Sequence, residues 1–223
     1  MKVPLPITCP ACGEKFTQEI NARNLPKYFR CPKCGVQPYH VWPLGNIVAR
    51  LLMERAKQEF ANSDITVAIL LFAIAVECEM SYLFFKWKGI DSGKVLAHRT
   101  VSDRQLWEKE WGSMRSIGKR LDKLSRLLTN MCFDQFASQN KQLLVPALSM
   151  FDPSTSIRDH FQDQLFERRN RIAHYGEVDF GKLDGEQCFS TALSLISLLH
   201  AMDQERIKRM DEDHKRASQQ GTC

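Results

Sequence analysis

Two Cys-Pro-x-Cys-Gly segments near the N-terminus could bind a metal ion. Cys9 and Cys12 form the first pair, Cys31 and Cys34 form the second, and a glycine follows each pair. Two intervening residues let both thiolates of a pair reach one ion, and the glycine relieves the tight backbone turn. Iron could occupy such a four-sulfur site, but zinc is its ordinary ion. The spacing therefore predicts a structural zinc site that is closed to substrate.

Basic and aromatic residues beside these cysteines could contact RNA. Cations interleaved with aromatic rings suit phosphate contact and base stacking. The cations are Lys15, Lys27 and Arg30, and the rings are Phe16, Tyr28 and Phe29. Alternatively, the rings form the small core of the metal-binding region while the charges keep it in solution. Both interpretations are open at this point.

A second set of reactive side chains lies between residues 166 and 176. On a helix, Arg169 shares one face with four apolar residues, so it interrupts an apolar stripe. Those apolar residues are Phe161, Leu165, Ile172 and Ala173. An unpaired charge there is costly, so Arg169 must find a partner or border a cleft. Asn170 and His174 share a neighbouring face, and the helix dipole favours the protonated imidazole in the last turn.

A carboxylate on a long apolar segment could be the partner of Arg169. Glu77 lies among Ala73, Met80 and Phe84, at positions that otherwise face a core. Glu79 is flanked in a similar way and could take the same role. We therefore predict an ion pair between Arg169 and Glu77, with Glu79 as the alternative partner.

These residues also have ordinary structural interpretations. Arg168, Arg169 and Arg171 could form surface salt bridges, and Glu167 lies four residues before Arg171. His174 could bond the last carbonyl groups of its helix. Surface pairing does not account for an arginine on the apolar stripe, so the combination favours a functional site.

The elements that would position these side chains change type near residue 44. Residues 1–44 are rich in proline and contain short β-compatible runs such as 15–17. After them a helical period dominates. We predict a mainly α fold, in which a helical bundle follows a small β-rich zinc ribbon. The predicted units are the ribbon over 1–44, an all-α domain over 45–212 and a flexible tail over 213–223.

Apolar spacing and capping signals divide the helical domain. The predicted helices cover 47–60, 64–87, 102–128 and 156–174, and a last helix opens at a capping box over 184–187. Residues 132–144 could continue the third helix, whereas 89–101 is expected to be a loop. Tyr175-Gly176 is a plausible stop for the fourth helix. The last helix should turn Ala192, Leu195, Ile196 and Leu199 inward and end in a solvated charged run from Asp203.

Composition is that of an ordinary soluble globular protein. Of 223 residues, 43% are hydrophobic and 26% are charged, and the net charge of +5 permits an acidic partner such as RNA. The N-terminus has no apolar run typical of a signal peptide. The apolar stretch 65–76 is too short to span a bilayer, so we expect a buried helix and no membrane. Clustered and single cysteines favour a reducing compartment, which we take to be the cytoplasm.

The segment from Arg169 to His174 resembles the motif of HEPN domains, in which an arginine and a polar residue precede a histidine after a short spacer. HEPN domains are compact helical bundles common in bacterial defence and toxin systems. The stretch 73–77 resembles the early helix that supplies an acidic residue in many of them. The resemblance covers roughly residues 46–210 and is carried by these two stretches, while 89–150 aligns with nothing.

This resemblance implies a metal-independent endoribonuclease, a toxin or an antiviral effector. His174 would act as general acid–base, Arg169 would stabilise the phosphoryl oxygens, Asn170 would orient the histidine or phosphate, and Glu77 would complete the site. It also implies a homodimer whose cleft presents Arg168 and Arg171 to RNA, and an antitoxin or sensor protein as partner. The alternative is a non-catalytic module that binds RNA, a nucleotide or a partner protein.

Overall fold

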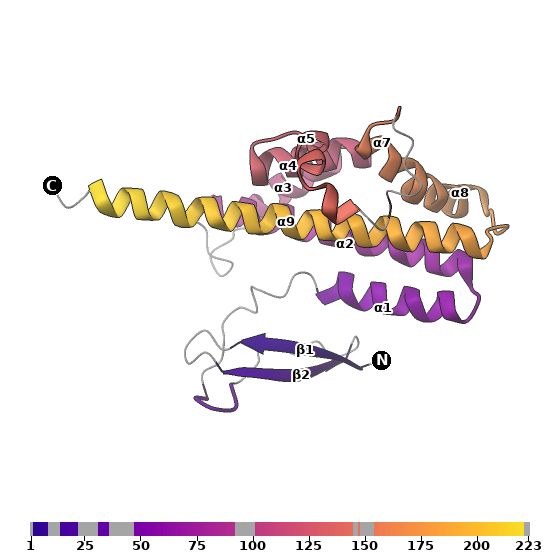
Figure 1. The fold of residues 1–223 in the computed structure, drawn as a ribbon, viewed down its shortest axis with the longest axis horizontal. Coiled ribbons are helices and arrows are strands. Elements are labelled where there is room, and N and C mark those ends of the chain that lie inside the picture. Colours follow the sequence, from indigo (N-terminus) through magenta and orange to yellow (C-terminus); the bar gives the residue numbers. More distant parts are fainter. Residues whose placement is uncertain are drawn as a thin grey trace.

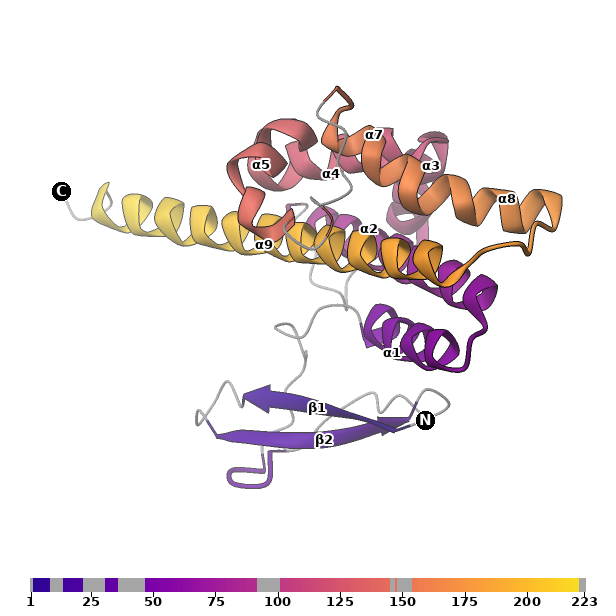
Figure 2. The same ribbon diagram turned by 45° about the vertical axis from the view of Figure 1, so that its right-hand side comes forward.

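The computed structural model describes residues 2–8, 14–21, 31–35, 47–91, 101–144, 147 and 154–220. These residues form a mainly helical protein, as the sequence predicts, with a two-stranded sheet near the N-terminus (Figure 1). In both ribbon views the sheet lies beyond α1 (Ile47–Ala61), at the edge of the helices (Figure 2). The functional residues of the helical part are therefore positioned by helix packing.

The N-terminal sheet is an antiparallel pair. Strand β1 (Lys2–Thr8) pairs with β2 (Lys15–Asn21), and the register joins Thr8 to Lys15 and Lys2 to Asn21. The β-compatible run at 15–17 thus begins the second strand, as predicted.

Helix α2 (Ile65–Asp91) is the centre of the helical domain. It packs against α1 and against the last helix, and it buries residues on nearly all of its sides. Asp64 caps it, because its Oδ1 accepts a hydrogen bond from the N–H of Val67 at 3.2 Å. The predicted central helix is confirmed, although it continues past Trp87 and includes Gly89, which the sequence assigned to a loop.

The length of α2 also changes the expectation drawn from its apolar stretch. The helix has 27 residues, and its most apolar 18-residue window has a mean hydropathy of 2.0. By length and composition alone it could cross a membrane, unlike the shorter run 65–76. Within the described residues, 56% of that window is buried inside the protein, as the predicted core helix requires.

The predicted helix over 102–128 is two helices. Three residues separate α3 (Val101–Ser113) from α4 (Ile117–Thr129), and the Ser116 hydroxyl caps α4 by accepting from the Lys119 N–H at 3.3 Å. The single-helix prediction is wrong because this N-cap outweighs the apolar period that runs through it. The break creates a bend at residues 114–116.

The segment 132–144 does not continue α4. Asn130 adopts a left-handed conformation with φ 63°, which ends that helix. Separate short helices follow, α5 (Phe133–Gln139) and the 3₁₀ turn η3 (Lys141–Leu144).

One continuous helix, here called the 157–175 helix, carries the arginine–histidine motif. It consists of α7 (Ile157–Phe161), a π-helical segment η4 (Gln162–Glu167) and α8 (Arg168–Tyr175). Gly176 ends it at φ 67°, with its N–H bonded to the carbonyl of Ile172 at 3.0 Å. The predicted helix and its glycine stop are confirmed, but the π segment was not expected; such segments are frequent at functional sites.

The last helix, α9 (Lys182–Gln220), begins two residues before the predicted capping box. Asp184 instead accepts a hydrogen bond from the Gly181 N–H at 2.9 Å. Gly185 lets α9 approach α1 closely, because a Cβ at this position would lie 2.5 Å from the Phe60 ring. Of the residues predicted to face inward, three are fully buried and Ile196 is half-buried; the three are Ala192, Leu195 and Leu199.

The charged run of α9 is only partly a solvated extension. Asp203 accepts hydrogen bonds from Lys86 Nζ at 2.7 Å and Trp87 Nε1 at 2.6 Å, and Arg206 pairs with Asp91 at 2.7 Å. These contacts hold the start of the run against α2. Beyond them α9 projects past the other helices (Figure 1) and continues to residue 220, through most of the segment predicted as a flexible tail.

Candidate functional site

The predicted ion pair between α2 and the 157–175 helix is present. Arg169 Nη2 lies 3.4 Å from Glu77 Oε2, and both side chains are partly exposed. Arg169 Nη1 also donates a hydrogen bond to Asn170 Oδ1 at 2.9 Å. Three of the four predicted catalytic side chains are therefore linked to one another.

Glu79, the alternative partner, lies in a different environment. Its carboxylate is buried, and Oε1 lies 3.3 Å from Nε2 of His200 on α9. Two residues along an α-helix turn the side chain by about 200°, so Glu77 and Glu79 face opposite sides of α2. Glu77 is thus the carboxylate that pairs with Arg169.

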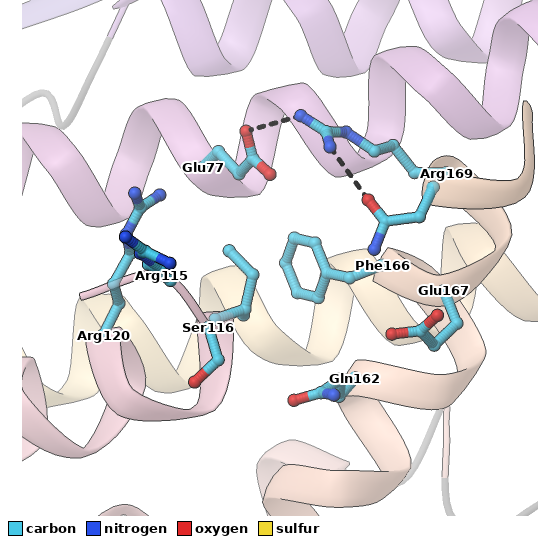
Figure 3. Close-up of a pocket in the computed structure, with 10 residues that line it drawn as sticks. Glu77, Arg115, Ser116, Arg120, Gln162, Phe166, Glu167 and Arg169 are labelled. Carbon is cyan, nitrogen blue, oxygen red and sulfur yellow. Dashed lines mark hydrogen bonds and ion pairs between the residues drawn. The ribbon is translucent and has the colours of Figure 1, made fainter. Parts of the chain in front are cut away.

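A pocket of about 370 Å³ lies beside this ion pair (Figure 3). Glu77 on α2 forms part of its lining, and the 157–175 helix contributes Phe166, Arg169 and Asn170. The opposite side comes from the bend and the first turn of α4. In Figure 3, Arg115 and Arg120 lie on that opposite side, with Glu77 between them and Arg169.

Arg115 and Arg120 are functional candidates that the sequence reasoning missed. Arg120 Nε donates to the Met114 carbonyl at 2.9 Å, and its guanidinium lies 5.2 Å from the centre of the Trp111 ring. Neither arginine forms an ion pair with any described residue. The available signal was Ser116, a favoured N-cap residue, which would have predicted the bend that brings both side chains to the pocket.

The other two arginines of the motif are engaged elsewhere. Arg168 reaches α9, where it pairs with Asp184 at 3.2 Å and donates to Gln187 Oε1 at 2.5 Å. Arg171 pairs with Glu177, to which its Nε donates at 2.6 Å, rather than with Glu167. The structure therefore brings neither of these predicted RNA-binding residues to the pocket.

His174 lies outside the pocket, at the exposed end of α8. It makes no hydrogen bond or ion pair within the described part of the chain. The last carbonyl groups of the helix are bonded by the backbone N–H groups of Gly176 and Glu177, so a capping role for His174 is not observed. Ala173 is also exposed, and the apolar stripe therefore ends at Ile172.

The second cysteine pair of the N-terminal region lies in a tight turn over residues 31–35. The Gly35 N–H bonds to the Cys31 carbonyl at 3.0 Å, and Gly35 has φ 69°, a conformation that suits glycine. Lys33 in this turn pairs with Glu14 at 3.3 Å. Cys31 is buried and Cys34 is exposed. This backbone fits the metal-binding turn that the spacing predicts.

Most of the other predicted site residues of this region lie outside the described part of the chain. Cys9, Cys12, Lys27 and Arg30 lie outside the described residues, and the exposed Lys15 begins β2. The described ranges contain no group of three or more histidine, cysteine or acidic residues that could hold a metal ion.

Comparisons with protein-family models, with curated proteins and with solved structures gave no significant match. The resemblance to HEPN domains stays a prediction from the two stretches of sequence that carry it. The Glu77–Arg169 pair adds a geometric link between those stretches.

Proposed function

We propose that the helical domain is a HEPN-type endoribonuclease that cleaves RNA without a metal ion. The observation that carries this proposal is the linked set of Glu77, Arg169 and Asn170 beside a pocket that two further arginines line. Preorganised cations and amides stabilise charge that develops on a phosphoryl group during transfer. Because Asn170 Oδ1 accepts from Arg169, its amide nitrogen is the atom left to donate to a phosphate oxygen.

In the proposed reaction the ribose 2′-hydroxyl attacks the adjacent phosphorus. His174 accepts the 2′-hydroxyl proton, the bond from phosphorus to the 5′-oxygen breaks, and a proton is returned to that oxygen. The products are a 2′,3′-cyclic phosphate and a 5′-hydroxyl end. His174 is exposed and lies about 6 Å along the helix from Asn170, so RNA that crosses α8 could contact both side chains.

The proposal includes a homodimer that brings two α8 ends together. An isologous contact places like residues opposite each other, so two copies of His174 would face one RNA cleft. Exposed apolar side chains lie near this end of the helix: Tyr175 is 82% exposed, and Val178 and Leu183 are each 65% exposed. Burial of these side chains would stabilise such a dimer.

The decisive experiment compares the full chain with His174→Ala on total RNA, followed by mapping of the cleaved ends. We expect the wild type to produce 2′,3′-cyclic phosphate ends and the variant to produce almost none. Arg126→Ala is the control, because Arg126 is exposed on α4 and does not line the pocket. Equal cleavage by wild type and His174→Ala, or none by the wild type, would contradict the nuclease.

A cellular role as a toxin or antiviral effector in the cytoplasm is part of the same proposal. Expression of the wild type should then arrest growth, and an antitoxin or sensor protein should control it. Cells that express the His174→Ala variant at the same protein level should grow normally. Arrest by both proteins would show that the effect does not depend on cleavage.

The alternative, a non-catalytic binding module, is favoured by one observation. His174 does not line the pocket, so the arginines there could hold an RNA phosphate without any reaction. RNA binding that needs Arg169, with no cleavage ever detected in the wild type, would support this alternative.

A structural zinc ion is proposed for the N-terminal region, with Cys9, Cys12, Cys31 and Cys34 as ligands. The turn at residues 31–35 and the Glu14–Lys33 pair beside it support the proposal. Metal analysis of the full chain should find one zinc ion per chain, and Cys31→Ser should lower this content. Cys132→Ser is the matched control, since Cys132 lies in the helical domain.

A further inference from the structure

A second pocket adjoins the arginine-lined one and differs from it in character. It has a volume of about 410 Å³ and shares Glu77 and Arg120 with its neighbour. Its apolar lining comes from Val48 on α1 and from a stripe along α2, which consists of Ile74, Cys78, Tyr82 and Phe85. The two pockets together form an apolar recess that leads into a cationic one.

The apolar recess presents surface that ordinary packing would bury. Val48 is 42% exposed and Ile74 is 37% exposed, whereas most of α2 is buried. Tyr82 and Phe85 supply aromatic rings on which a flat ring could stack. Burial, Glu79 and Asp203 raise the pKa of Tyr82 to about 12, so its hydroxyl stays neutral at physiological pH. The recess therefore suits a flat, uncharged group.

The boundary between the pockets suits an anion. Arg120 uses its Nε on the Met114 carbonyl, which leaves both amino groups of its guanidinium for a ligand. Arg115 is exposed and has no hydrogen bond or ion pair with a described residue. Guanidinium groups bind phosphate in a two-pronged geometry, and these two have no carboxylate partner among the described residues to displace.

The geometry points to a nucleotide-binding site, with the phosphate on Arg115 and Arg120 and the base in the recess formed by Ile74, Tyr82 and Phe85. A nucleotide unit joins a flat aromatic ring to an anion at this scale. The unit comes from single-stranded RNA next to the cleaved bond, an assignment that rests on the proposed function. A free mononucleotide shares the same chemistry and is the other source to be tested.

Binding can be measured on the full chain with His174→Ala, which separates binding from cleavage. The probes are a labelled single-stranded RNA, an abasic oligomer of the same length, and adenosine monophosphate. Arg120→Gln is compared with Arg126→Gln, because Arg126 is an exposed arginine on α4 that does not line either pocket. Ile74→Asn is compared with Val67→Asn, since Val67 on α2 is 36% exposed and lies outside both linings.

Arg120→Gln should weaken RNA binding and lower the slope of log affinity against log salt by about 0.7, the value for one lost phosphate contact on a single strand. Ile74→Asn should weaken RNA binding by at least about fivefold while the abasic oligomer is unaffected. Both control variants should bind like the parent. Thermal unfolding of each variant confirms that it is folded.

The outcomes separate this inference from the proposed function. Binding of RNA or of the mononucleotide that depends on Arg120 and Ile74 supports the site. The probe that binds more tightly shows whether the natural ligand is RNA or a free mononucleotide. Equal binding by Arg120→Gln and Arg126→Gln, or by Ile74→Asn and Val67→Asn, overturns it. Cleavage by the wild type is measured separately, so a nuclease without this site and a site without a nuclease give different results.

Discussion

Two adjacent arginines on the 157–175 helix have opposite roles. Arg168 faces α9, where Asp184 and Gln187 hold it, and its side chain is only 15% exposed. Arg169 faces α2 and the pocket, where it contacts Glu77 and Asn170. The two residues are identical in type and neighbours in sequence. A cluster of arginines therefore does not define an RNA surface until the partner of each guanidinium is known.

The largest effect that tests this comparison is expected for Arg169→Ala. Loss of one preorganised donor to the phosphoryl group should lower the rate of RNA cleavage by about 100-fold or more. The measurement is the single-turnover rate on a labelled RNA, with Arg126→Ala as a control that should keep the parent rate. Cleavage by Arg169→Ala at the parent rate would show that Arg169 is not part of the catalytic site.

Arg168→Ala should act on stability instead. Removal of its hydrogen bonds to Asp184 and Gln187 should lower the free energy of unfolding by about 1–3 kcal/mol. Urea denaturation measures this change, and the cleavage rate per folded molecule should stay at the parent value. A large loss of rate with unchanged stability would show that both arginines serve the site.

His160, on the buried side of the same helix, should make the free energy of unfolding depend on pH. Burial lowers the pKa of His160 below its ordinary value of 6.5, with Asp163 opposing the shift. The unfolded state therefore binds more protons below pH 6.5, and the free energy of unfolding should fall as the pH decreases through this range. Urea denaturation at several pH values should show a shallower decline for His160→Gln. Identical slopes for both proteins would exclude His160 as the cause.

The smallest effect is expected for Arg171→Ala. Its pair with Glu177 is largely exposed, and such pairs contribute about 0–1 kcal/mol to stability. RNA binding should match that of Arg126→Ala. If Arg171→Ala binds RNA clearly more weakly than Arg126→Ala does, Arg171 contacts RNA, as the resemblance to HEPN domains implies.

The sequence could predict the Glu77–Arg169 pair because both charges interrupt apolar periods of long helices. Such helices bury their apolar faces against each other, so two inward charges tend to meet. The same period could not reveal Arg115 and Arg120, because it continues across the bend between α3 and α4. That bend depends on Ser116, a local hydrogen-bonding choice that competes with the apolar pattern.

The sequence also could not predict which way the motif faces, because the prediction assumed a regular α-helix throughout. Ala173 was expected on the apolar face and is exposed, and His174 lies outside the pocket that contains Asn170. The π segment η4 contains Leu165 and separates Phe161 from the motif, so the residues used to define that face lie before, within and after it. The two parts of the helix therefore do not share one register.

The π segment gives this helix a means of changing direction without any change to the motif. A π turn contains one more residue than an α turn, and one residue of an α-helix corresponds to a rotation of about 100°. Deletion of a single residue within Gln162–Glu167 would turn Arg169 and Asn170 away from Glu77 while their spacing to His174 stayed the same. Insertions and deletions in this one turn could thus rotate an intact motif about the helix axis during evolution. Chains with identical motifs could then direct them toward different neighbouring helices.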